Sequence, residues 1–273
     1  MARAGDGELI RATPRRGFAR VFAWYARRLL RSRFHRVRLT PEGRGLLRGL
    51  DGEAAPLIIC CTHASWWDPL VGLVLQRELL PSRAAFSPMD ADQLRRFAFF
   101  RKVGLFGIDP DDPASLAAMT SHVSELVAAH PRLTLALTPQ GRFADPREPV
   151  RIRPGAAALA ARLEIPRVVC VAIEYAFWQD QKPEVFVHAV ESWAEAASTT
   201  GWQRAIATGM QEAADELAQR VISREPAGFE IMLGAASGRA TATNPVHALW
   251  LTLRGRSGEI EARRAGRTTE ARA

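Results

Sequence analysis

The chain of 273 residues has few of the features that mark several large protein classes. Its three cysteines, Cys60, Cys61 and Cys170, lie in apolar segments and show no paired metal-ligand spacing. Arginines interrupt every apolar run before it approaches the ~20 residues that span a bilayer, and the first residues lack the apolar region and cleavage site of a secretory signal. We therefore expect a cytoplasmic protein with reduced, structural thiols and with no metal or redox cofactor.

Motifs of nucleophilic and nucleotide-binding enzymes are also missing. The chain has no Gly-x-Ser-x-Gly elbow and no Gly-x-x-x-x-Gly-Lys loop, and its glycines at Gly43, Gly45 and Gly49 do not complete a dinucleotide fingerprint. A chain of this length can bury one sizeable core, and no internal repeat or linker divides it. The sequence therefore predicts one globular domain with appendages.

The net charge of +8 lies at the two ends of the chain. Residues 1–38 carry 11 arginines against two acidic residues, a net charge of +9, and residues 254–273 carry six arginines against three glutamates, a net charge of +3. The residues between them have a net charge of −4. Because the body is mildly acidic, an extended basic binding face is disfavoured, and we expect no nucleic-acid partner.

Strand and helix patterns alternate along most of the chain. Strands are expected near residues 57–61, 83–87, 105–108, 132–138, 167–174 and 184–190. Helices are expected at 69–80, 91–101, 114–129, 154–163 and 201–222, with Pro113 and Pro154 in first turns. The alternation predicts an α/β fold with a mostly parallel or mixed sheet covered by helices. Ligands in such folds gather at the carboxyl ends of the strands.

The first expected strand runs into a possible catalytic pair, His63 and Asp68. An imidazole can remove a hydroxyl proton, and a carboxylate on its other nitrogen fixes the tautomer and stabilises the imidazolium. A structural role is the alternative: Asp68 precedes Pro69 and an apolar run, and with Ser65 it has the form of a capping box. His63 would then be a satisfied histidine at a strand end. The spacing alone does not decide between these interpretations.

Four blocks in order resemble those of the lysophosphatidic acid acyltransferase family. The first is the His63 to Asp68 segment, in which Thr62 replaces the usual Asn before the His. The other three are Lys102-Val103-Gly104-Leu105-Phe106-Gly107-Ile108-Asp109, Leu137-Thr138-Pro139-Gln140-Gly141-Arg142 and Ile165-Pro166-Arg167-Val168-Val169-Cys170-Val171. Together the blocks span about residues 57 to 175, and their order and spacing argue against coincidence.

The resemblance implies transfer of a fatty acyl group from a coenzyme A or acyl-carrier-protein thioester to a hydroxyl of a lipid acceptor. It makes His63 the general base and Asp68 its orienting carboxylate, with no cofactor beyond the co-substrate. It places seven residues near the substrates: Ser65, Trp66, Trp67, Asp109, Gln140, Gly141 and Arg142. Taken singly, these residues are typical of turns, caps, rim packing and solvated loops. Glu174 and Tyr175 are expected at the rim of the same cleft.

Two departures from the family pattern concern the acceptor. The second block commonly ends Ile-Asp-Arg, with the arginine implicated in holding the acceptor phosphate, but here Pro110 follows Asp109. The third block commonly reads Pro-Glu-Gly-Thr-Arg, whereas here Gln140 replaces the glutamate and Arg142 stands one place earlier. We therefore expect a lysophospholipid or another polar lipid as acceptor. The altered blocks also support an alternative, a noncatalytic lipid- or acyl-binding member of the same fold.

The amino-terminal region contains an amphipathic basic helix. At ~100° per residue, apolar side chains including Phe18, Phe22 and Tyr25 fall on one face, and arginines including Arg20 and Arg27 fall on the opposite one. Such a helix either packs on the body or lies in a membrane interface. With a lipid substrate implied, we expect these five residues to contact an anionic membrane, at the inner face of the cell membrane.

The chain is thus expected to have three parts. Residues 1–40 form the membrane-associating arm, residues 41–235 the acyltransferase domain, and residues 236–273 a carboxyl-terminal extension. The last 20 residues, rich in Arg, Ala, Gly and Thr, are expected to be mobile.

Overall fold

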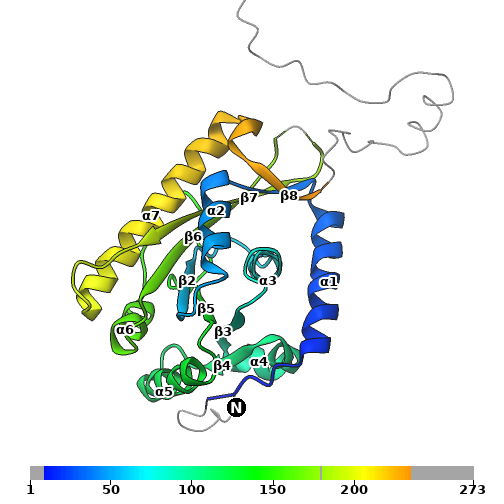
Figure 1. Ribbon diagram of the computed structural model, residues 1–273. Helices are drawn as coiled ribbons and strands as arrows, with labels where there is room; N and C mark the ends of the chain where they lie inside the picture. Colours follow the sequence, from blue (N-terminus) through cyan, green and yellow to red (C-terminus); the bar gives the residue numbers. More distant parts are fainter. Residues whose placement is uncertain (1–8, 179, 235–273) are drawn as a thin grey trace, which may run out of the picture.

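One eight-stranded mixed sheet runs through the residues that the computed structural model describes, 9–178 and 180–234 (Figure 1). The strand order is β4-β3-β5-β2-β6-β7-β1-β8. The strands from β4 to β6 are parallel, β7 is antiparallel to β6, β1 is parallel to β7, and β8 is antiparallel to β1. Their bounds are β1 (Arg36–Leu39), β2 (Leu57–Cys61), β3 (Ala84–Asp90), β4 (Leu105–Ile108), β5 (Leu133–Leu137), β6 (Arg167–Ala176), β7 (Glu184–Ser192) and β8 (Glu230–Gly234). The predicted α/β fold with a mixed sheet is confirmed.

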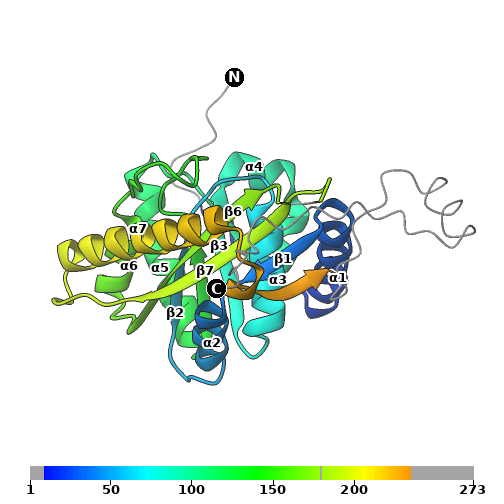
Figure 2. The ribbon, with the colours of Figure 1, turned by 90° about the horizontal axis from the view of Figure 1, so that it is seen from above.

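Helices cover both faces of this sheet (Figures 1 and 2). One face carries α1 (Arg16–Arg33), α2 (Pro41–Leu50) and α3 (Asp68–Leu79), and the other carries α5 (Pro113–Ala129), α6 (Gly155–Arg162) and α7 (Thr199–Ser223). Ile58 and Cys60 of β2 point into the second layer, and Leu57 and Ile59 point into the first. This alternation gives the protein two cores, one on each side of the sheet.

The three cysteines are free thiols inside this structure. Cys60 and Cys170 are buried on paired strands, whereas Cys61 points to the other face of β2, as the sequence predicts. Burial raises the pKa of Cys170 to about 11 and that of Cys61 to about 12. The thiols are therefore protonated at neutral pH and play the packing role expected of them.

Several helix starts follow directly from the sequence. The Asp112 carboxylate accepts a hydrogen bond from the Ala114 N–H at 2.9 Å, and Pro113 occupies the first helical position of α5. Ser198 caps α7 in the same way through the Gly201 N–H. Pro154 lies at the cap position just before α6, one residue earlier than expected.

Three elements are absent from the sequence prediction: β1, α2 and β8. Arg38 lies inside β1 and looks like a surface residue, but it is buried, paired with Glu184 and stacked over Trp178. The three glycines of α2 argue against a helix. Gly43 is required there because a Cβ would stand 2.8 Å from the backbone nitrogen of Ala189. The folded body therefore begins before residue 41, since β1 pairs with both β7 and β8.

The expected helix at 91–101 is two elements. The α-helix α4 (Ala91–Arg96) ends at Phe97, where the backbone leaves the helical region (φ −118°, ψ 53°), and the 3-10 helix η1 (Ala98–Val103) follows. In η1, Phe99 and Phe100 both pack against Phe22 of α1. A second 3-10 turn, η2 (Pro226–Gly228), precedes β8.

The helix α1 packs on the body, and it buries a different face from the one expected to be apolar. Its buried residues are Ala23, Ala26 and Leu30, and the helix lies beside α3 (Figure 1). Phe22 is partly buried, and Arg27 is paired with Glu78 of α3 instead of facing solvent. None of the described helices is long and apolar enough to cross a bilayer. The expected extension at 236–273 lies outside the described residues.

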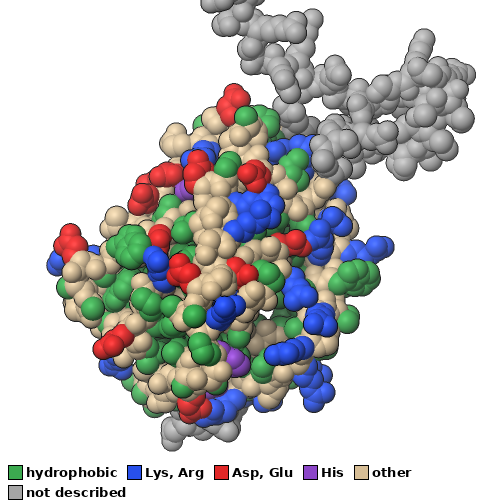
Figure 3. Space-filling view, in the orientation of Figure 1, with side chains coloured by type: hydrophobic (Ala, Val, Ile, Leu, Met, Phe, Trp, Pro, Cys, Tyr) green, Lys and Arg blue, Asp and Glu red, His purple; other side chains and the backbone are tan. Residues whose placement is uncertain are grey.

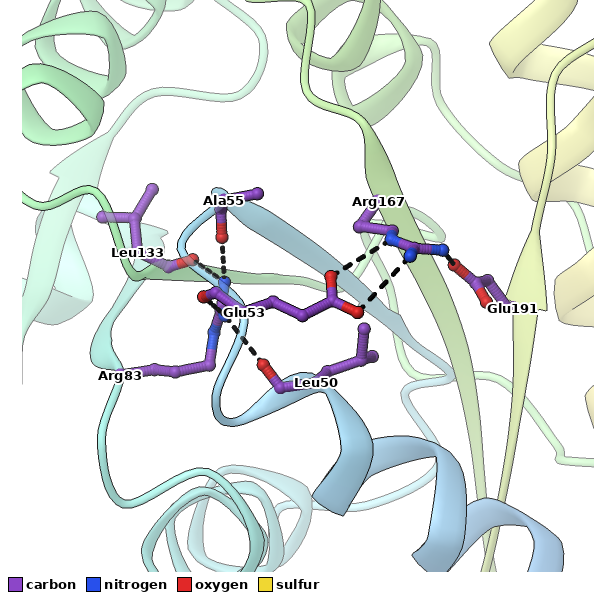
Figure 4. Close-up of polar contacts among 7 residues, drawn as sticks. All are labelled: Leu50, Glu53, Ala55, Arg83, Leu133, Arg167 and Glu191. Atoms are coloured by element: carbon purple, nitrogen blue, oxygen red, sulfur yellow. Dashed lines mark hydrogen bonds and ion pairs between the residues drawn. The ribbon is translucent and has the colours of Figure 1, made fainter.

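A buried arginine holds the amino-terminal edge of the sheet together (Figure 4). The guanidinium of Arg83 donates hydrogen bonds to the carbonyl oxygens of Leu50, Glu53, Ala55 and Leu133, at 2.5–2.9 Å. Its Nε donates to the hydroxyl of Thr134 at 3.0 Å. One side chain thus ties together the loop before β2, the start of β3 and the start of β5. Nearby, Arg167 joins Glu53 to Glu191 of β7.

We predict that Arg83→Met lowers the free energy of unfolding by about 3–5 kcal/mol, because the buried carbonyls lose their shared donor. Urea denaturation measures this change. Arg77→Met, at an exposed arginine of α3, is the matched control, and its expected effect is within about 0.5 kcal/mol. Equal stability of the two variants would contradict the role of Arg83.

Candidate active site

The carboxyl ends of the parallel strands bring the first three sequence blocks to one edge of the sheet. His63 lies two residues after β2, Gln140 three residues after β5, and Asp109 directly after β4. The fourth block forms the first part of β6, and this strand ends at the same edge with Tyr175 near its last position. This is the edge at which α/β folds place ligands.

Thr62 fixes the chain as it leaves β2. Its N–H donates to the carbonyl of Val171 at 2.9 Å, and its hydroxyl accepts the N–H of Ile173 at 3.0 Å. Both bonds reach β6, so the backbone before His63 is held to a neighbouring strand. The residue that replaces the family's usual Asn therefore serves a structural purpose here.

His63 and Asp68 form a hydrogen-bonded pair, with Nδ1 of the imidazole 2.9 Å from Oδ2 of the carboxylate. A carboxylate only accepts, so this contact places the proton on Nδ1 and leaves Nε2 as the ring atom for exchanging a proton. The side chain of His63 is 20% exposed, whereas that of Asp68 is 4% exposed. The base thus faces outward with a buried carboxylate behind it.

The Asp68 carboxylate has two further donors. The Ser65 N–H donates to Oδ2 at 2.8 Å, and the Tyr175 hydroxyl donates to Oδ1 at 2.5 Å. Burial raises the pKa of Tyr175, and the neighbouring Asp68 charge raises it further, so this hydroxyl stays a donor. Ser65 also accepts the N–H of Trp67, which completes a turn at the start of α3. The Asp68 carboxylate therefore holds the turn before α3 and orients His63 at the same time.

The third block and the residues just after it bind the backbone of His63 through both its N–H and its carbonyl. The side-chain oxygen of Gln140 accepts the His63 N–H at 3.0 Å, and the Ala144 N–H donates to the His63 carbonyl at 2.9 Å. Between them the exposed Phe143 ring lies against the imidazole, with ring centroids 4.3 Å apart. Gln140 thus supplies an acceptor for the backbone of His63. Phe143, which sequence reasoning passed over, lies against the His63 ring.

A link between the second and third blocks comes from Arg153. Its guanidinium donates to Asp111 at 2.8 Å and lies against Gly141, where a Cβ would meet its Nε at 2.9 Å. Gly141 has φ +65°, so a side chain there would be strained as well as crowded. Arg142 turns away to pair with Glu148 at 3.1 Å. Asp109 is exposed and accepts the Asp111 N–H, as expected of a turn residue.

The two tryptophans differ in their surroundings. Trp67 is partly buried against the core, with its ring 5.2 Å from that of Phe34. Trp66 is exposed and touches Trp67 edge to face. Glu174 points to the other face of β6, where it is buried and paired with Arg147 of the third-block loop. Burial raises the pKa of Glu174, and Arg147 opposes this effect.

The side chains gathered around His63 come from the first and third blocks, from the residue directly after the third block and from the end of β6. They are Ser65, Asp68, Gln140, Phe143 and Tyr175. Asp109 and Arg142 lie on the flanking loops and form local contacts. No spacing in the sequence predicts that Phe143 lies on His63 or that Arg153 lies on Gly141, because both contacts depend on how the loop at 139–153 folds back.

Comparison with known proteins finds similarity in structure and none in sequence. No protein-family model and no curated protein matches the sequence. Among solved structures, the chain is similar to the crystal structure of the 1-acyl-sn-glycerophosphate (LPA) acyltransferase PlsC from Thermotoga maritima. The likeness has a TM-score of 0.46 and 12% sequence identity, and it covers 77% of this chain and 80% of that chain.

We predict that Gln140→Ala lowers the free energy of unfolding by about 1–3 kcal/mol, because the partly buried His63 N–H loses its acceptor. Gln140→Glu keeps an acceptor in place and is expected to retain most of that stability. Chemical denaturation of both variants tests this, and equal losses would show that the amide oxygen is not the feature that matters.

Proposed function

We propose that this protein is an O-acyltransferase that moves a fatty acyl group from an acyl thioester to a hydroxyl of a lysophospholipid or another polar lipid. The observation that carries the proposal is the oriented pair of His63 and Asp68, with an outward-facing base and a buried carboxylate. The four-block resemblance of the sequence supports the same reaction. The third-block loop, which is hydrogen-bonded to His63 itself, adds to that support.

In the proposed reaction, Nε2 of His63 takes the proton of the acceptor hydroxyl as the oxygen attacks the thioester carbonyl. The imidazolium that forms is stabilised by Asp68 through Nδ1. The carbon–sulfur bond then breaks, and the leaving thiolate takes the proton from the imidazolium. The products are an ester and a free thiol, and the chemistry requires no covalent enzyme intermediate.

The donor is proposed to be coenzyme A or acyl-carrier protein, and no further cofactor is needed. For the acceptor, Arg142 and Arg153 are two of the exposed cations of the third-block loop. Each is paired with a carboxylate, Glu148 or Asp111, at the surface. Surface pairs of this kind contribute little stability, so an anionic headgroup can compete for either guanidinium.

We predict that His63→Ala lowers thiol release from an acyl thioester by about 10²–10⁴-fold, because the general base is lost. Asp68→Asn is expected to impair turnover as well, because the imidazolium loses its stabilising charge. His130→Ala is the matched control, since His130 precedes β5 at the opposite edge of the sheet. The measurement is free thiol produced with and without candidate acceptors.

Wild-type turnover in folded His63→Ala protein would refute the assigned role. Mass spectrometry of lipid extracts from cells with active or His63→Ala protein identifies the acceptor. An unchanged lipidome together with no thioester turnover would favour a noncatalytic lipid- or acyl-binding protein of the same fold.

We also propose that α1 brings the protein to an anionic membrane at the inner face of the cell membrane, although through a different face from the one the sequence suggests. The exposed residues of the outward face, named here the α1 surface, are Arg20, Val21, Trp24, Tyr25, Arg28 and Arg31. Basic side chains gather over this helix, at the right of the space-filling view (Figure 3). Phe18 and Phe22 stack on each other, and Phe22 also packs against η1. Aromatic rings beside arginines suit the boundary between acyl chains and anionic headgroups.

We predict that Trp24→Ala weakens binding to phosphatidylglycerol vesicles by about tenfold, which corresponds to losing one interfacial aromatic group. Trp193→Ala is the control, because Trp193 is 62% exposed, close to the 63% of Trp24, but follows β7. Vesicle sedimentation measures both. Unchanged vesicle binding of the Trp24→Ala variant would contradict the proposal that α1 contacts the membrane.

A further inference from the structure

The carboxylate of Asp68 is held through both of its oxygens. Oδ2 accepts from His63 and from the Ser65 N–H, which are close to Asp68 in the chain. Oδ1 accepts from the hydroxyl of Tyr175, which stands on β6, more than a hundred residues further along. Two donors on one oxygen restrain the position of that oxygen. A donor on the other oxygen fixes the carboxylate plane.

We propose that Tyr175 is a positioning residue that holds the Asp68 carboxylate in the plane at which it meets Nδ1 of His63. This inference rests on the proposed function, because it assigns Tyr175 a role in the same reaction. The phenol does not face the reacting atoms. It acts through Asp68, as second-layer hydrogen bonds commonly do when they fix an active-site side chain.

The surroundings of Tyr175 suit this role. Its ring lies 5.7 Å from that of Phe34, which in turn packs against Trp67, so aromatic contacts hold the phenol in place. Besides His63 and Tyr175, the thiol of Cys61 lies near Asp68, and burial keeps it neutral by raising its pKa to about 12. Glu174 points to the opposite face of β6 and is paired with Arg147. The carboxylate of Asp68 is thus the acceptor for the Tyr175 hydroxyl.

A purely structural role has to be separated from this one. If the hydroxyl only satisfied a buried carboxylate, its removal would lower the stability of the fold, and the folded variant would keep its turnover. A hydroxyl that fixes the carboxylate plane would change kcat and leave KM unchanged, because the substrates do not touch it. Its effect would also depend on the charge of Asp68.

The contact itself can be observed without an activity assay. The chain has two tyrosines, so in Tyr25→Phe protein every phenol signal comes from Tyr175. The tyrosine doublet in ultraviolet resonance Raman spectra is expected to show a strong hydrogen-bond donor. Asp68→Asn in the same background should weaken that donor signature, and an unchanged spectrum would overturn the contact.

The closing experiment is a double-mutant cycle on kcat with Tyr175→Phe, Asp68→Asn and the double variant, each confirmed to be folded by thermal denaturation. Tyr175→Phe keeps the ring, and we expect it to lower kcat by about tenfold with KM unchanged. In protein that already carries Asp68→Asn, the same change should have little further effect. Full kcat in Tyr175→Phe protein, or an equal loss in both backgrounds, would overturn the inference alone. Absence of acyl transfer in the wild-type protein would overturn the proposed function and, with it, this role.

Discussion

The buried carboxylate of Asp68 is the constraint on which the rest of the site depends. An ionised carboxylate removed from water costs several kcal/mol unless donors surround it. Here the donors are the ring of His63 after β2, the N–H of Ser65 before α3 and the hydroxyl of Tyr175 near the end of β6. Satisfying one charge therefore fixes a strand end, a helix start and a neighbouring strand relative to one another. The orientation of His63 follows from that arrangement.

The local part of this site could be predicted from the sequence. His63 and Asp68 are five residues apart at the end of an apolar strand, and the same short segment contains Ser65, whose N–H donates to Asp68. The contact between His63 and Gln140 joins the end of β2 to a loop 77 residues away, and the residue spacing within either block does not predict it. The resemblance placed the two blocks near each other. It did not indicate which atoms meet.

The buried face of α1 shows a different limit of sequence reasoning. Periodicity finds the large apolar side chains of a helix, but a close helix neighbour selects small ones. Ala23 and Ala26 allow α3 to approach, and so larger residues such as Trp24 and Tyr25 remain outside. The same lesson holds for β1 and α2, where arginine and glycine suggested loops. Both elements are stabilised by partners far along the chain, which local propensity does not include.

The helix α1 also connects the two surfaces that the proposed function needs. Trp24 and its neighbouring arginines face outward near the middle of the helix. Phe34, directly after its last turn, packs against both Trp67 and Tyr175 behind His63 and Asp68. The proposed membrane surface and the proposed acyl-transfer site therefore lie along and at the end of the same helix.

The pairing of β1 has a consequence for how the chain is made. β1 lies between β7 and β8, so Val37 meets Val185 on one side and Leu233 on the other. A ribosome adds about 5–20 residues per second. Roughly 10–40 s therefore pass between the synthesis of β1 and that of β8, the later of its two partners. During this time the basic helix before it is already synthesised while its sheet is incomplete. α1 and β1 are thus synthesised well before the strands that complete their packing.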